Sequence, residues 1–123
     1  MFSITFTRDL IIIPCSPLPD HEIGAKVEFH GIVRANEKGE ILSGLTYEAY
    51  EPMAHKQLER IFNELLAAHP CDLITFIHRL GWVPTGEVSL YLCCLSAHRA
   101  EAFAFCSQAI DRMKQDVPIW KKI

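Results

Sequence analysis

The segment EVSLYLCCLS, residues 87–96, restricts the possible folds more than any other, because it is almost continuously apolar. A strand with one solvated face alternates apolar and polar side chains, whereas a strand covered on both faces is an unbroken apolar run. We therefore expect a central strand with protein packed on each side of it. The chain has 123 residues, 50% of them hydrophobic, which suffices for one domain with a substantial core.

Further strands are predicted from short runs rich in β-branched and aromatic residues. These runs are residues 2–7, 10–13, 25–34, 45–50 and 72–81. Gly31 interrupts the alternating pattern of the 25–34 strand, which indicates a bulge or a close approach of two backbones. The polar stretch 35–44 contains two glycines and is predicted to be a mobile loop, and the proline-rich stretch 15–24 is predicted to be a second loop.

Two helices are predicted from apolar side chains that recur with the 3.6-residue period. The first has Pro52 in its first turn and continues to about His69. The second has Ser96 as its predicted N-cap and ends near Asp116, because Pro118 disfavours helical geometry at the preceding residue. Its predicted buried positions are Ala102, Phe103, Cys106, Ala109, Ile110 and Met113. This order of elements predicts an α+β domain in which helices cover a sheet.

Charge and cysteine content narrow the classes of function. A formal net charge of −3 argues against a bulk electrostatic grip on nucleic acid, so any anion site must be a local cluster of cations. The 5 cysteines form no Cys-x-x-Cys pair, and we expect reduced cysteines packed as small hydrophobes rather than a metal site. The run LIIIP is far shorter than the roughly 20 residues of a membrane span and lacks the flanks of a signal peptide. We therefore expect a cytoplasmic protein.

The cations at the two ends of the second helix are the first candidate functional residues. His98 and Arg99 open this helix, where a cation opposes the helix dipole unless an anion is bound there. Lys114 lies in the last turn and could simply complement the dipole. Arg99 and Lys114 lie roughly 22 Å apart along the helix axis, too far to line one small pocket. Either they serve two sites, or a second copy of the chain completes each pocket.

The remaining candidate functional residues can be explained by structural roles when only their positions in the sequence are considered. Arg34 ends a strand, and Lys121 and Lys122 could belong to a solvated tail. A Cys–His hydrolase needs a thiolate beside a base, and no motif singles out such a pair here. The sequence also contains no glycine-rich phosphate loop.

Five motifs in order resemble the large, catalytic subunit of molybdopterin synthase: FHGIVR, LTYEAYEPMA, IHRLG, SAHRAEAF and DRMKQDVPIWKK. The resemblance extends from about Gly24 to Lys122, and the SAHR and IWKK elements are its most specific parts. It implies that residues 1–123 form a single α+β domain with the α/β-hammerhead fold and an additional β subdomain, its helices packed on a mostly antiparallel sheet. It also implies a homodimer with one small ubiquitin-like subunit at each end, a heterotetramer.

The resemblance implies a reaction as well. The small subunit would carry sulfur as a C-terminal Gly-Gly thiocarboxylate. Two such sulfurs would be inserted into cyclic pyranopterin monophosphate to form the dithiolene of molybdopterin, a sulfur transfer in molybdenum cofactor biosynthesis. The family uses no metal or organic cofactor for this step.

The family's functional positions can be assigned to residues of this sequence through the matching motifs. Lys114 and Lys121 correspond to its two catalytic lysines. The substrate-binding candidates are Arg34, His98, Arg99 and Lys122. The resemblance implies that His98 and Arg99 reach the pocket from the other protomer.

Three further motif residues have structural roles on this interpretation. Glu48 is expected to pair with a pocket cation. Ile119 and Trp120 are expected to pack the tail down and hold Lys121 in place.

One departure from the family leaves other functions open. The family continues beyond the WKK element with a segment that carries another arginine, whereas this sequence ends at Ile123. We therefore expect a site that lacks a lid or one phosphate contact. A non-catalytic paralogue that binds a ubiquitin-like tail without sulfur transfer is one alternative. A generic anion-binding domain, supported only by the cation cluster, is another.

Overall fold

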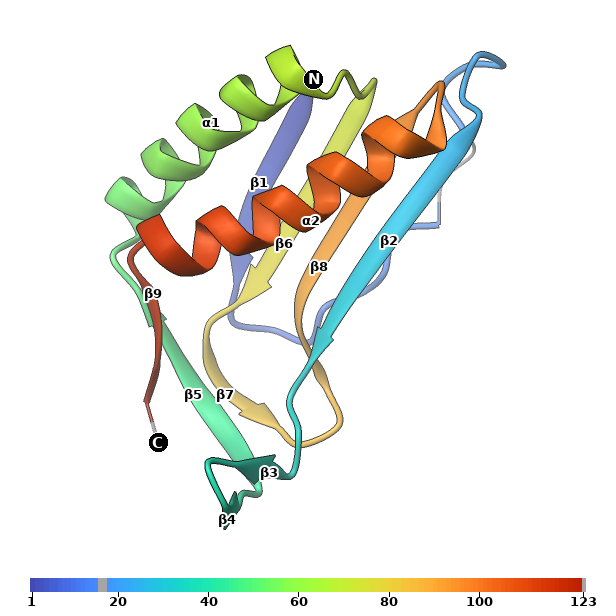
Figure 1. Ribbon diagram of the computed structural model, residues 1–123. Helices are drawn as coiled ribbons and strands as arrows, with labels where there is room; N and C mark the ends of the chain where they lie inside the picture. Colours follow the sequence, from blue (N-terminus) through green and yellow to red (C-terminus); the bar gives the residue numbers. More distant parts are fainter. Residues whose placement is uncertain (16–17, 123) are drawn as a thin grey trace.

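Two long helices lie against one face of a four-stranded sheet (Figure 1). The computed structural model describes residues 1–15 and 18–122. In sheet order the strands are β1 (Phe2–Thr7), β6 (Leu73–Arg79), β8 (Val88–Ser96) and β2 (Ala25–Ile32). β1 and β6 are parallel and the other two pairs are antiparallel, which confirms the predicted α+β fold with a mostly antiparallel sheet.

β8 lies inside the sheet and is covered on both faces, as its apolar sequence predicts. On one face, Leu92 and Cys94 belong to the core beneath α1 (Glu51–Ala68) and α2 (Arg99–Asp116). On the other face, Tyr91 and Cys93 pack against Ile11. The predicted strand 10–13 is therefore wrong: these residues pair with no strand and lie across the sheet as an irregular apolar cover.

A smaller antiparallel sheet at one end of the main sheet forms the additional β subdomain (Figure 1). Its strands, in spatial order, are β7 (Gly81–Pro84), β5 (Gly44–Ala49) and β9 (Ile119–Lys122). It has its own apolar cluster, which consists of Val33, Leu45, Tyr47, Leu80 and Val83. Neither β7 nor β9 was predicted as a separate strand.

The stretch 35–44, predicted to be a loop, contains a short hairpin. Its strands are β3 (Asn36–Glu37) and β4 (Glu40–Ile41). Lys38 and Gly39 between them have φ values of 52° and 83°, as expected for the tight turn of a two-residue hairpin. The hairpin brings a carboxylate, Glu37, towards β9, where it contacts a lysine.

The second helix differs in two details from its prediction. Ser96 is the last residue of β8 and its hydroxyl donates to the carbonyl of Pro70, so the N-cap is His98 instead. Phe103 is 60% exposed, and Phe105 is fully buried in its place. The helix turns Phe105 towards the sheet together with Ala102, Cys106, Ala109 and Met113. No helix among the described residues is long and apolar enough to cross a membrane.

The predicted irregularity at Gly31 is confirmed. The pairing of β2 with β8 shifts register between Gly31 and Ile32. A Cβ atom at Gly31 would lie 3.2 Å from a ring carbon of Phe29 and 3.3 Å from Cβ of Leu90. Phe29, Gly31, Ile32 and Leu90 all line the cavity described in the next section.

Candidate functional site

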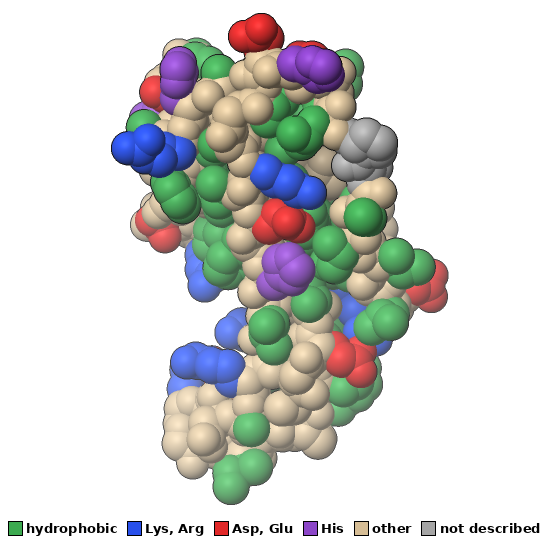
Figure 2. Space-filling model, turned by 90° about the vertical axis from the view of Figure 1, so that its right-hand side faces the viewer, with side chains coloured by type: hydrophobic (Ala, Val, Ile, Leu, Met, Phe, Trp, Pro, Cys, Tyr) green, Lys and Arg blue, Asp and Glu red, His purple; other side chains and the backbone are tan. Residues whose placement is uncertain are grey.

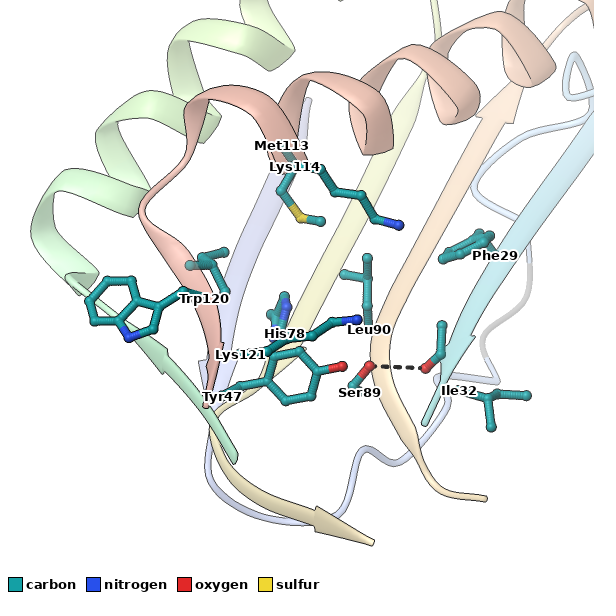
Figure 3. Close-up of a pocket in the computed structure, with 12 residues that line it drawn as sticks. Phe29, Ile32, Tyr47, His78, Ser89, Leu90, Met113, Lys114, Trp120 and Lys121 are labelled. Carbon is teal, nitrogen blue, oxygen red and sulfur yellow. Dashed lines mark hydrogen bonds between the residues drawn. The ribbon is translucent and has the colours of Figure 1, made fainter. Parts of the chain in front are cut away.

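A cavity of about 390 Å³ lies where the end of α2 and the strand β9 face the main sheet (Figure 3). Its walls come from β2, β5, β6, β8, α2 and β9, and it contains both Lys114 and Lys121. In Figure 2 the surface is hollowed between the helix-covered body and the narrower β subdomain, and Lys or Arg side chains gather along this hollow. The structure thus brings the two predicted catalytic lysines into one pocket.

Pro118 explains why these two lysines meet. α2 ends at Asp116, and Val117 adopts an extended conformation with φ −98° and ψ 133°. The chain then reverses, and the carbonyl of Pro118 accepts a hydrogen bond from the N–H of Tyr50. β9 runs back along β5 with Lys121 opposite Tyr47. Lys121 therefore returns to the cavity beside the last helical turn, which carries Lys114.

The two lysines differ in their electrostatic surroundings. The Lys114 side chain forms no hydrogen bond or ion pair with any residue that the structure describes. The ammonium of Lys121 lies 3.6 Å from Oε1 of Glu37, whose side chain is only 14% exposed. Among the described residues no carboxylate therefore offsets the charge of Lys114, whereas Glu37 of the β3–β4 hairpin partly offsets the charge of Lys121.

Lys122 lies on the opposite face of β9 and does not line the cavity. Its ammonium donates to Oε1 of Glu48 at 3.3 Å, and the indole N–H of Trp120 donates to the other oxygen of Glu48 at 3.2 Å. Glu48 does pair with a lysine, as predicted, but with Lys122 rather than with a lysine in the pocket. Trp120 is 48% exposed, so pairing of β9 with β5 holds the tail more than burial of Trp120 does.

His78 is a pocket residue that sequence reasoning did not assign. It is the last of the three buried side chains that alternate along β6, and it is 3% exposed. Its Nδ1 lies 2.8 Å from the carbonyl oxygen of Arg79. Burial lowers the pKa of His78 to about 4, so its imidazole is neutral at physiological pH. One sequence signal could have indicated this role: in the alternating segment LITFIHR, the histidine occupies a position where an apolar, inward-facing residue is expected.

His98 and Arg99 lie at the other end of α2. They border a second cavity of about 440 Å³, together with Gly24, Ala97, Ala100 and Phe103. All six residues are exposed. Arg34 is also exposed and lines neither cavity. Within one chain the structure therefore separates His98 and Arg99 from Lys114 and Lys121, while Arg34 follows β2 just outside the residues that line the lysine cavity.

The cysteines are not arranged for nucleophilic chemistry. All five are free, and only Cys15 is exposed. Burial raises the pKa of Cys71 to about 11 and also raises the pKa of Cys93, so both remain thiols. Among the described residues, no three His, Cys, Asp or Glu side chains converge as ligands of a metal ion.

Comparison with known proteins gives one family. The family model described as MoaE protein matches residues 8–116. The molybdopterin synthase catalytic subunit of Oryza sativa subsp. indica is 42% identical over 103 residues, which cover 84% of this chain and 53% of that protein. The chain thus spans about half the length of the curated relatives that it matches.

Solved structures agree with this match. The chain shares 38% sequence identity with the crystal structure of molybdopterin synthase from Staphylococcus aureus, and the two superpose with a TM-score of 0.78. The match covers 84% of this chain and 75% of that chain. A second match is a complex of subunits 1 and 2 of molybdopterin-converting factor from Helicobacter pylori 26695, with 27% sequence identity and a TM-score of 0.68. This match covers 81% of this chain and 65% of that chain.

Proposed function

Because the chain belongs to the MoaE protein family, we propose that it is the catalytic subunit of a molybdopterin synthase and acts in molybdenum cofactor biosynthesis. One observation carries the proposal: Lys114 and Lys121 of the matching DRMKQDVPIWKK motif line a single cavity.

The proposed reaction is a sulfur transfer. Each small ubiquitin-like subunit delivers one sulfur as a C-terminal thiocarboxylate, and two such sulfurs are inserted into cyclic pyranopterin monophosphate, which becomes the dithiolene of molybdopterin. In each transfer sulfur displaces an oxygen from the attacked carbon, and water then cleaves the bond between sulfur and the tail, which leaves the tail as a carboxylate. Both reactants are anions, so a pocket with two ammonium groups attracts both. The Helicobacter pylori neighbour, a complex of two subunits, supports a partner of this kind.

Lys114 and Lys121 have different proposed roles. As sulfur is transferred, negative charge develops on the acyl oxygen of the tail and on the oxygen that leaves the attacked carbon. Lys114, which has no acidic partner among the described residues, stabilises this charge. Lys121, held by Glu37, assists in charge stabilisation or proton transfer.

We also propose that two copies of the chain form the working enzyme, within a heterotetramer. His98 and Arg99 of one protomer would then complete the pocket that holds Lys114 of the other, since the length of α2 separates them within one chain. Arg34 and Lys122 would contact the substrate or the tail from the rim.

The cytoplasm is the proposed location of this reaction. Four of the five cysteines are buried and free, which supports a reducing compartment. A reducing compartment is also one in which the thiocarboxylate of the partner would persist.

The test is molybdopterin formation from purified protein, thiocarboxylated small subunit and cyclic pyranopterin monophosphate. The parent should form product, and Lys114→Ala should lower the rate by about 100-fold or more. Lys56→Ala is the matched control, since Lys56 is an exposed lysine of α1 outside the cavity. A parent that binds the small subunit but forms no product would favour the non-catalytic paralogue. A parent that binds phosphate ligands but no small subunit would favour the anion-binding domain.

A further inference from the structure

His78 is a buried polar residue of the pocket to which the proposed reaction assigns no role. Its Nδ1 is 2.8 Å from the carbonyl oxygen of Arg79. A carbonyl oxygen can only accept a hydrogen bond, so Nδ1 carries the proton and donates it. In a neutral imidazole the other nitrogen, Nε2, is then a hydrogen-bond acceptor.

The surrounding aromatic side chains hold the His78 ring in one orientation. The Tyr47 ring lies 5.2 Å away at an interplanar angle of 67°. The rings of Phe76 and Phe6 lie at 6.3 Å and 6.5 Å. With its Nδ1 bound and its faces and edges packed, the ring cannot turn to direct Nε2 elsewhere without breaking these contacts.

The Nε2 atom is unpaired but accessible. It makes no hydrogen bond with any described residue. Among the described residues, one buried side-chain nitrogen or oxygen is both sealed from solvent and without a hydrogen-bond partner. That atom is Nε of Arg79. Nε2 of His78 is therefore not fully sealed, and the His78 side chain lines the cavity. Figure 3 shows His78 on the β6 side of this cavity, among the side chains from β5, β8 and β9.

Nε2 is a group of this cavity that can only accept a hydrogen bond. Lys114 and Lys121 can only donate, whereas the hydroxyls of Tyr47 and Ser89 can both donate and accept, and that of Ser89 donates to the carbonyl of Gly31. A ligand that presents only negative oxygens would satisfy the lysines and leave Nε2 unused. A ligand that also carries N–H groups would satisfy both.

We propose that His78 is a ligand-binding residue whose Nε2 accepts a hydrogen bond from an N–H group of a bound reactant. This inference rests on the proposed function, which offers two sources of such a donor. One is the N–H of the pterin ring, and the other is a backbone N–H of the glycine tail of the small subunit. The lysines bind the charge of the reactants, and His78 positions an uncharged part of one of them.

Two substitutions separate the roles of the two ring nitrogens. In His78→Asn the side-chain amide can still donate to the Arg79 carbonyl, but nothing replaces Nε2. In His78→Gln the amide reaches the position of Nε2, and the bond to Arg79 is lost. We expect His78→Asn to weaken binding of one reactant by about five- to a hundredfold, because a buried N–H loses its acceptor. His78→Gln should retain most of the affinity while it lowers stability.

Affinity is measured separately for cyclic pyranopterin monophosphate and for the small subunit in its carboxylate form, which cannot transfer sulfur. The reactant whose affinity falls in His78→Asn identifies the source of the N–H. If His78→Asn binds both as tightly as the parent, the inference is wrong.

A measurement on the unaltered protein covers the case in which a variant does not fold. In ¹⁵N NMR of histidine-labelled parent, the His78 resonances should report a proton on Nδ1, and the Nε2 resonance should move when one reactant is added. A proton on Nε2 in the free protein would overturn the inference. An unmoved Nε2 resonance in a parent that forms molybdopterin would overturn it while the proposed function stands. An unmoved resonance in a parent that forms no product would overturn both.

Discussion

The two ends of α2 carry similar cations in very different surroundings. At the C-terminal end, Lys114 faces a cavity with walls from six elements, and the floor of that cavity includes the buried residues Tyr47 and His78. At the N-terminal end, His98 and Arg99 border a cavity whose lining residues are all exposed. One chain thus builds a cavity with a buried floor at one end of the helix and a fully exposed surface at the other. An open cationic surface of this kind fits the role of completing a site in another molecule.

Mixing two inactive variants is the strongest test of this difference. Lys114→Ala and Arg99→Ala should each lose about 100-fold or more of the activity. If each pocket combines the two ends of α2 from different protomers, a mixed dimer has one pocket with both residues intact. Random pairing of equal amounts then restores about a quarter of the parent activity.

The matched control for that experiment is a mixture of Lys114→Ala and Lys121→Ala. These two residues line one cavity of the same chain, so a mixed dimer has no intact pocket and activity should stay low. No recovery in the first mixture would mean that the two ends of α2 do not combine in one pocket. Recovery in the control would mean that Lys114 and Lys121 do not act in the same pocket.

Stability should depend on pH through His78, which lines the cavity at the C-terminal end of α2. The unfolded chain protonates His78 near its ordinary pKa of 6.5, whereas burial lowers its pKa to about 4 in the folded protein. Between these values the unfolded chain binds more protons, so stability falls as the pH decreases from 6.5 to 4. The difference corresponds to about 3 kcal/mol.

Urea unfolding of the parent, His78→Gln and His98→Gln between pH 4 and pH 7 measures this effect. His78→Gln should lose most of the pH dependence. His98→Gln is the matched control, since His98 is an exposed histidine that lies outside this cavity. Equal slopes for the parent and His78→Gln would show that His78 is not the group responsible.

The same contrast explains how much of the site could be predicted from sequence. The apolar run of β8 and the 3.6-residue periods of the helices are local patterns, and they predicted the central strand and both helices correctly. The strand β9 depends on pairing with the distant strand β5, in which Tyr47 lies opposite Lys121. The IWKK stretch has only two strand-favouring residues, too few to predict a strand by itself. His78 was missed for the same reason, since its inward position matters only when β9 and α2 close the cavity around it.

Replacing a glycine by alanine should change stability by different amounts at the two cavities that lie at the ends of α2. A Cβ atom at Gly24, which lines the open cavity, would lie 2.3 Å from the backbone oxygen of Ala97. A Cβ atom at Gly31 would meet Phe29 and Leu90 side-chain atoms at 3.2 Å and 3.3 Å. Because backbone yields less readily than side chains, Gly24→Ala should destabilise the protein by about 1–3 kcal/mol, and Gly31→Ala by less. Thermal unfolding measures both, and the reverse order would contradict the described packing.

The smallest expected effect comes from the acidic partner of Lys121. Glu37 offsets part of the positive charge of Lys121 at 3.6 Å, and an anionic ligand must compete with it. Glu37→Gln removes this competition and should tighten binding of cyclic pyranopterin monophosphate about two- to fivefold, the range expected for a partly exposed ion pair. The gain should shrink as salt concentration rises.

Glu48→Gln is the matched control for Glu37→Gln, because Glu48 pairs with Lys122 on the opposite face of β9. Its affinity for the pterin should equal that of the parent. If both substitutions tighten binding equally, the effect is one of overall charge and the two faces of β9 are electrostatically equivalent. If Glu37→Gln weakens binding, Glu37 holds Lys121 in its binding position more than it competes with the ligand, and the carboxylate belongs to the working site.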